Sequence, residues 1–295
     1  MRRKGSVPAT AQQVAIVADS TISLPRPMLE QWGIHVVPLE LRFGDRVYRD
    51  GDDLDPATFY QMLQVADLLP TTSAPRPASF LEAFRRASAL APHVLCLTLI
   101  SHLSATHELA VMVADLARQA LPGVTVQVVD THTAAGAEAL VALAAAKAAR
   151  QGHTLEQVLE TCHTVMDGVN LIAFLDTLHF VWRGGRVPRV AAWMGAVLNV
   201  KPMLELAKGE IRLVARPRTR HRATDRLLKI MAQRAQGRPI VVNVIHAADP
   251  KGAHQLYCRV LAQFSCREAF ISEFSPVIGV HTGPGLLGLA FYVVD

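Results

Sequence analysis

Residues Leu69–Pro77, which read LPTTSAPRP, mark the point where the chain passes from a polar loop into a helix. Three hydroxyl side chains precede two prolines, and apolar residues then recur with helical spacing from Phe80 to Leu90. This order is typical of a helix N-terminus, where free N–H groups and the helix dipole suit an anion. The hydroxyls of Thr71, Thr72 and Ser73 therefore either cap a helix over 78–90 or bind an anion.

On both sides of this stretch, apolar runs alternate with hydroxyl-bearing loops and helical patterns. The runs at 14–17, 94–100 and 124–129 have the character of buried strands, and each leads into a polar loop. This alternation predicts an α/β fold whose parallel sheet carries helices on both faces, with ligands at the carboxyl ends of the strands. We expect a further strand over 35–41 and helices over 25–32, 57–65, 78–90, 107–121 and 134–151.

From about residue 154 the predicted elements no longer alternate regularly, which indicates a second α/β domain with a mixed sheet. A hairpin is expected around Lys208–Glu210, between strands over 202–206 and 211–215. The other expected elements are helices over 155–166, 190–198, 221–236 and 251–264, strands over 171–174 and 239–245, and two terminal strands. The predicted organisation is a disordered basic tail over 1–13 and α/β domains over 14–153 and 154–295. The sequence leaves open whether the last strand stays in the second domain or returns to the first.

Composition and motifs exclude several classes of protein. The chain has 295 residues, of which 51% are hydrophobic and 19% charged, and it has no uncharged apolar run of 18 residues. We therefore expect no integral membrane association. The N-terminus lacks the apolar segment of a secretory signal, and the four cysteines show no C-x-x-C spacing, which predicts a cytoplasmic protein with reduced thiols. The twelve histidines form no H-E-x-x-H pair, so no metal site is expected.

Nucleotide-binding motifs are absent or misplaced in the sequence. There is no G-x-x-x-x-G-K-[ST] segment, and the G-x-G-x-x-G pattern at 283–288 lies too near the last residue to open a dinucleotide-binding unit. No cofactor is therefore expected. The glycines are better explained by a sharp turn and a close backbone approach to something bound. His281 precedes this turn and is either structural or a ligand contact.

Positive charge is concentrated between residues 180 and 236, where 13 Lys and Arg face three acidic residues. A basic region on an otherwise acidic chain favours an anionic ligand or partner rather than a general nucleic-acid surface. The arginines from Arg212 to Arg222 either dock such a partner or form a solvated edge.

Six segments, taken in order along the chain, resemble the DegV family of bacterial fatty-acid-binding proteins. They are VADSTISLP, TTSAPRP, ISHLSATHELA, LHFVWRGGRVP, LNVKPMLELAKGEI and GVHTGPG. The resemblance extends over nearly the whole chain from Ala15. The chain departs from the family pattern at Ala74, Ile100 and Ala105, where the family usually has Gln, Ser and Gly.

The resemblance implies a carrier that binds a long-chain fatty acid near the junction of two domains and presents it to a separate fatty-acid kinase. The hydroxyls that hold the carboxylate would be those of Thr72 and Ser101, and Arg186 and His281 would lie near the head group. Helix N-termini at 72–80 and 101–107 would add donors. The alternative is an enzyme that acts on a small phosphorylated or carboxylated metabolite through Arg186 and His281. An apolar channel favours the carrier, and a small polar cleft with a poised base favours the enzyme.

Overall fold

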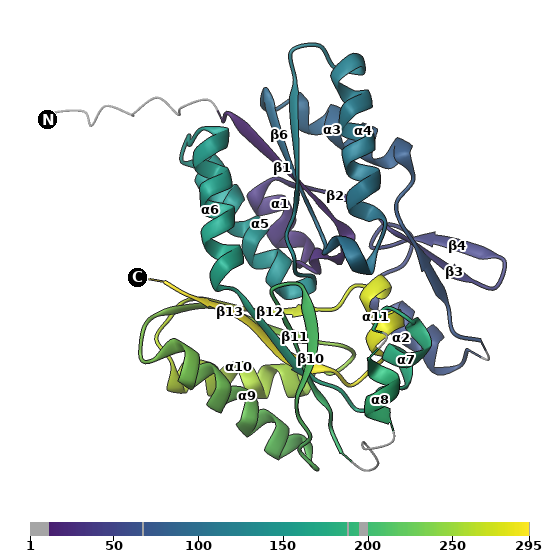
Figure 1. Ribbon diagram of the computed structural model, residues 1–295, viewed down its shortest axis with the longest axis vertical. Helices are drawn as coiled ribbons and strands as arrows, with labels where there is room; N and C mark the ends of the chain where they lie inside the picture. The colour runs from purple at the N-terminus through teal and green to yellow at the C-terminus, as the bar shows by residue number, and fades with distance from the viewer. Residues whose placement is uncertain (1–11, 67, 188, 195–199, 295) are drawn as a thin grey trace, which may run out of the picture.

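The computed structural model describes residues 12–294 except 67, 188 and 195–199, and it contains two main sheets (Figure 1). The expected tail over 1–13 lies mostly outside the described residues. All strands of the first sheet run parallel, as the sequence predicts. Their order is β2 (Ile34–Val37), β1 (Val14–Asp19), β6 (His93–Thr98) and β7 (Thr125–Asp130).

Helices cover both faces of this N-terminal sheet because its strands are apolar on both sides. Ala15 and Val17 of β1 point to the face covered by α3 (Pro77–Ser88) and α4 (Thr106–Ala120). Val14 and Ile16 point to the opposite face, which is covered by α1 (Arg26–Trp32), α5 (Ala135–Arg150) and α6 (Leu155–Gly168). The completely buried β1 is thus the continuous apolar strand expected of a parallel sheet.

The second sheet is mixed. Neighbouring strands in this sheet run antiparallel, except that β11 and β12 run parallel to each other. The last strand, β13, lies inside this sheet between β8 and β11, so the alternative in which it returns to the N-terminal sheet is wrong. The sheet order is β10 (Glu210–Ala215), β9 (Met203–Ala207), β8 (Asn170–Phe174), β13 (Leu287–Val293), β11 (Ile240–His246) and β12 (Cys266–Glu273).

The predicted hairpin forms between β9 and β10, with Lys208 and Gly209 as its two-residue turn. Both residues have positive φ angles, 49° and 79°, as a type I′ turn requires. The outer face of the mixed sheet is covered by α9 (Arg220–Ala235) and α10 (Pro250–Gln263). The helix expected over 190–198 begins as α8 (Val190–Met194), and the rest of that prediction lies outside the described residues.

Helix α5 occupies the middle of the molecule, between the two sheets (Figure 1). Ala137 and Leu140 pack towards the mixed sheet, and Ala139 and Leu143 pack towards the parallel sheet. Fourteen of its 16 residues are buried. Small side chains are needed here because both sheets must approach the same helix closely.

Gly136 provides a test of this close approach. A Cβ atom at this position would lie 2.4 Å from Cγ2 of Ile245 and 2.9 Å from Nδ2 of Asn243. We expect Gly136→Ala to lower the free energy of unfolding by about 1–3 kcal/mol, as overpacking does, measured by urea denaturation. Gly168→Ala is the matched control, since nothing lies within 4 Å of a Cβ there. Equal stability of the two variants would contradict the close packing.

A small third sheet, which the sequence did not predict, lies beside the main sheets. It has the order β4 (Arg46–Arg49), β3 (Glu40–Phe43) and β5 (Thr71–Ser73). The expected strand over 35–41 is divided between β2 and β3, on either side of Pro38. The hydroxyls of Thr71–Ser73 therefore belong to a strand that pairs with β3. Helix α3 begins at Pro77 after Arg76, which makes no side-chain cap, so the alternative in which one of these hydroxyls caps the helix is wrong.

Two short helices beside the third sheet were also absent from the sequence-based prediction. Helix α11 (Pro276–Thr282) packs on α2 (Pro56–Gln64) and on α7 (His179–Gly184). A Cβ at Gly279 of α11 would lie 2.4 Å from Cε1 of Phe59, so this contact needs glycine. In the part of the chain that the structure describes, no helix is long and apolar enough to cross a membrane.

Candidate functional site: an apolar cavity with a polar end

A cavity of about 310 Å³ lies between the two main sheets, and we call it the inner cavity. The start of α5, the loop before α4, strands β8 and β9 and helix α11 each contribute to its wall. Most of the lining is aliphatic. The aliphatic lining residues are Leu39, Leu99, Leu103, Leu171, Leu175, Val181, Val187, Leu204, Leu206, Ile211, Val277, Ile278 and Leu286.

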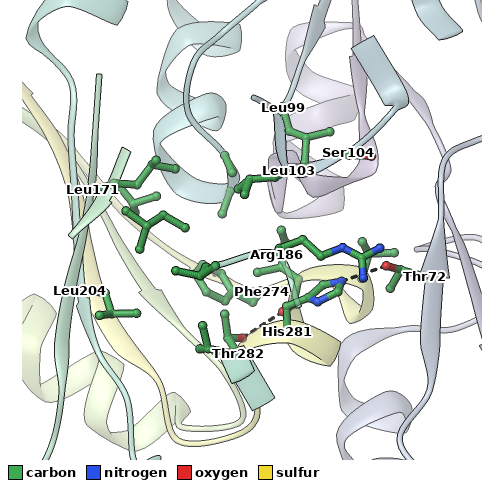
Figure 2. Close-up of a pocket in the computed structure, with 18 of the residues that line it drawn as sticks. Thr72, Leu99, Leu103, Ser104, Leu171, Arg186, Leu204, Phe274, His281 and Thr282 are labelled. Atoms are coloured by element: carbon green, nitrogen blue, oxygen red, sulfur yellow. Dashed lines mark hydrogen bonds between the residues drawn. The ribbon is translucent and has the colours of Figure 1, made fainter. Parts of the chain in front are cut away.

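Three polar side chains from separate elements meet at one end of the inner cavity (Figure 2). Thr72 comes from β5, Arg186 from the segment after α7, and His281 from α11. Thr72 Oγ1 lies 2.9 Å from His281 Nε2. Figure 2 shows the Arg186 side chain extending towards this pair, while Leu171 and Leu204 lie at the other side of the cavity.

His281 is neutral at neutral pH. Burial, helped by the nearby Arg186 guanidinium, lowers its pKa from 6.5 to about 4. Its Nδ1 is buried without a hydrogen-bond partner and faces Gly184, where a Cβ would lie only 2.4 Å away. A bare ring nitrogen is less costly to bury than an unpaired N–H, so the proton belongs on Nε2. His281 then donates to Thr72, and the Thr72 hydroxyl proton is free for a ligand.

The turn at Gly184-Gly185, which is expected from the sequence, holds Arg186 at the mouth of the inner cavity. Helix α7 ends there because Gly185 adopts the left-handed conformation, with a φ of 69°. One Nη1 proton of Arg186 is donated to the Gly184 carbonyl oxygen at 2.8 Å. Arg186 is solvent-exposed, so it provides positive charge at the cavity mouth without the full cost of burial.

A second cavity of about 440 Å³, the outer cavity, adjoins this polar end. It shares Arg186 and His281 with the inner cavity and is otherwise lined by Leu69, Pro70, Thr71, Trp182, Arg183, Gly184 and Val280. Arg183 is not among the site residues expected from the sequence, although it stands three residues before Arg186 in the same glycine-containing segment. The two cavities therefore adjoin each other at Arg186 and His281.

Ser101 is not brought to the other three predicted site residues. It lies in the short helix η2 (Ser101–Leu103), and its backbone N–H donates to Asp130 Oδ2 at 3.1 Å. It does not line either cavity, whereas Ser104 lines the inner one. Ser104 in turn hydrogen-bonds Thr106 Oγ1 at 2.8 Å. Ser104 lines the cavity in place of Ser101 because the chain turns at η2 before α4 begins at Thr106.

The glycines after His281 approach the protein's own side chains. A Cβ at Gly283, where φ is 70°, would lie 2.1 Å from Cδ2 of Phe180. A Cβ at Gly285, where φ is 85°, would lie 2.3 Å from Oδ2 of Asp176. The expected close approach to something bound is therefore wrong for these two glycines, because they pack against Phe180 and Asp176 and do not line either cavity.

Within the described residues, no group of three or more His, Cys, Asp or Glu side chains could hold a metal ion. The four cysteines are free, and Cys96 and Cys162 are buried.

The two-sheet α/β fold and an apolar cavity with a cationic, hydroxyl-bearing end define the class of this protein as a two-sheet α/β protein with an enclosed apolar site. The chain belongs to the DegV family. The family model described as "Uncharacterised protein, DegV family" matches residues 13–294. A DegV domain-containing protein of Streptomyces coelicolor is 39% identical over 281 residues, which cover 95% of this chain and 98% of the relative.

Solved structures of the family share the fold. A DegV family protein from Thermus thermophilus, described by its fatty-acid binding, superposes with a TM-score of 0.87 at 33% identity, covering 96% of this chain and 100% of that one. DegV of Bacillus subtilis, described as a fatty acid binding protein, superposes with a TM-score of 0.85 at 29% identity, covering 96% and 100%.

Proposed function

We propose that this protein is a cytoplasmic carrier that binds one long-chain fatty acid and presents its carboxylate to a separate fatty-acid kinase. The observation that carries the proposal is the inner cavity, which is aliphatic along most of its wall and polar at one end. Fatty-acid binding by the relatives from Thermus thermophilus and Bacillus subtilis supports it.

The carboxylate would lie at Thr72, Arg186 and His281. A carboxylate removed from water costs several kcal/mol unless well-placed donors replace the water. The Thr72 hydroxyl proton, left free by the His281 hydrogen bond, supplies one donor. The Arg186 guanidinium has N–H groups beyond the one given to Gly184, and it supplies the charge.

The acyl chain would fill the aliphatic part of the inner cavity. Each buried methylene contributes about 0.8 kcal/mol, so ten methylenes give roughly 8 kcal/mol before the costs of association. A small polar metabolite would gain nothing from these walls, which disfavours the alternative of an enzyme acting on such a substrate.

Presentation to a kinase is supported by the outer cavity, which opens from the head-group position and is lined by Arg183 and Arg186. Planar guanidinium groups bind two phosphate oxygens at once. Part of the basic region is already used inside the fold, since Arg220 pairs with Asp176 and Asp249, and Arg234 with Glu205. The exposed Arg216, Arg218 and Arg222 are the candidates for docking the kinase.

Native mass spectrometry of the purified protein tests the carrier function. We expect a bound species with the mass of a fatty acid, released on denaturation and replaced by added oleate. Protein that carries no such species and does not take up oleate would contradict the proposal.

Thr72 and Ser101 provide a matched test of the head-group position. We expect Thr72→Ala to weaken oleate binding by about 1.5–3 kcal/mol, because it removes a hydrogen bond to a charged group. Ser101→Ala makes the same chemical change outside both cavities and should leave the affinity unchanged. Isothermal titration calorimetry measures the oleate affinity of both variants. If Ser101 is the carboxylate ligand, Ser101→Ala will weaken binding and Thr72→Ala will not.

A further inference from the structure

Two acidic side chains and one hydroxyl form a completely buried group that contacts Leu99, a residue lining the inner cavity. Asp19 ends β1, Thr21 lies in the short helix η1 (Ser20–Ile22), and Glu138 lies in the first turn of α5. All three side chains are 0% exposed. Thr21 Oγ1 lies 2.6 Å from Asp19 Oδ1 and 2.8 Å from Glu138 Oε2.

Burial raises the pKa of the Asp19 carboxyl group, but three hydrogen-bond donors surround it and oppose that effect, so Asp19 is the better candidate for the ionised member. Its Oδ1 accepts from the Thr21 backbone N–H at 2.9 Å, and its Oδ2 accepts from the Leu99 backbone N–H at 2.7 Å. Both oxygens therefore act as acceptors, as those of a carboxylate do.

The Thr21 hydroxyl has a single proton and cannot donate to both carboxyl groups. Its shorter contact, to Asp19, takes that proton. The Thr21 oxygen then faces Glu138 Oε2 with a lone pair, and an ionised Glu138 would place two acceptors 2.8 Å apart in a buried site. A proton on Glu138 Oε2 resolves this conflict.

The surroundings of Glu138 also favour the neutral acid. The charged groups that face it are Asp19 from β1 and Asp130 from β7, and the Cys96 thiol of β6 lies near both Asp19 and Glu138. Burial, followed by the negative charge of Asp19, raises the pKa of Glu138 well above 4.5. Asp50 is the next acidic group in this region. Burial, with a smaller contribution from the negative charge of Asp19, raises the pKa of Asp50 to about 7, and its Oδ2 accepts a hydrogen bond from Ser20 Oγ.

We propose that Glu138 is a protonated carboxylic acid in the folded protein at neutral pH and that it positions the cavity wall through a hydrogen-bond relay. The relay runs from Glu138 through the Thr21 hydroxyl to the Asp19 carboxylate and on to the Leu99 backbone. Leu99 lines the inner cavity, so Glu138, Thr21 and Asp19 are positioning residues for a site that they do not touch.

The pH dependence of folding follows from this proton. A carboxyl whose folded-state pKa is raised stabilises the protein fully below its unfolded pKa of about 4.5, and this contribution is lost as pH rises towards the folded pKa. The folding equilibrium constant of the natural protein should fall by up to about tenfold per pH unit from this group alone. Glu138→Gln replaces the acid with a neutral donor that does not titrate.

Urea denaturation between pH 5 and pH 8 compares Glu138→Gln with Asp19→Asn, which makes the same carboxyl-to-amide change. We expect Glu138→Gln to fold and to gain stability over the natural protein as pH rises. Asp19→Asn should lose stability at every pH, because its amide directs a donor at the N–H groups of Thr21 or Leu99. If the ratio of the folding equilibrium constants of the natural protein and Glu138→Gln does not change with pH, the proposal is overturned.

Infrared spectroscopy supplies a measurement that does not depend on the stability of any Asp19 variant. The natural protein at pH 7 should show a carboxylic-acid carbonyl band that is missing from Glu138→Gln. Asp50 also contributes to the carboxylic-acid band at pH 7, but it is present in both proteins, so its contribution cancels in the difference between the two spectra. Identical spectra in the carboxylic-acid region would also overturn the proposal.

Discussion

Replacing Ala173 with phenylalanine is expected to abolish tight binding of long-chain fatty acids. Ala173 lines the inner cavity and pairs with Leu204 on the neighbouring strand. Figure 2 shows Leu204 on the side of the cavity away from Thr72. A phenyl ring there occupies space that the acyl chain needs. Exclusion of about five methylenes costs roughly 4 kcal/mol, or close to a thousandfold in affinity for oleate. Isothermal titration calorimetry measures this loss.

A short fatty acid is the internal control for this variant. Octanoate needs only the part of the cavity nearest the polar end, so its weak affinity should be the same for Ala173→Phe and the natural protein. The melting temperature of the ligand-free variant shows whether the larger side chain has disturbed the fold. Equal loss of octanoate and oleate binding in a stable variant would mean that the acyl chain does not lie along β8.

The second large effect is expected at the head group, where Arg186→Gln removes the positive charge and keeps a hydrogen-bond donor. We expect oleate binding to weaken by about 1.5–3 kcal/mol, on the order of ten- to a hundredfold. The loss is smaller than it would be for a buried ion pair, because Arg186 is exposed to solvent. Raising the salt concentration should reduce the difference between the variant and the natural protein.

Arg183→Gln is the matched control, since Arg183 lines the outer cavity and not the inner one. This variant loses the same charge three residues away and should bind oleate as the natural protein does. With a cognate kinase and ATP, it should form acyl phosphate more slowly, because the outer cavity then has one guanidinium fewer for phosphate. If Arg183→Gln weakens oleate binding as much as Arg186→Gln, the carboxylate does not lie where we place it.

Most regular elements could be predicted from the sequence because their signals are local. The buried run that starts at Val14, the Lys208-Gly209 turn and the helical spacing after Phe80 each depend on residues a few positions apart. Strand alternation with helices was enough to predict the parallel sheet, since the crossover rule restricts such units to few arrangements. The errors lie in short elements such as β5 and α11, whose three and seven residues are stabilised by tertiary contacts.

The sequence by itself determined the α/β class, the parallel and mixed sheets and the segments that carry Thr72, Arg186 and His281. Only the tertiary structure decided that these three side chains meet, because they come from elements far apart in the chain and their contact depends on how the third sheet, α7 and α11 pack. It also placed Ser101 outside both cavities and Thr72 in a strand. The tertiary structure also decides the protonation that we propose for Glu138. A glutamate has an ordinary pKa in any sequence, and burial beside Asp19 raises it here.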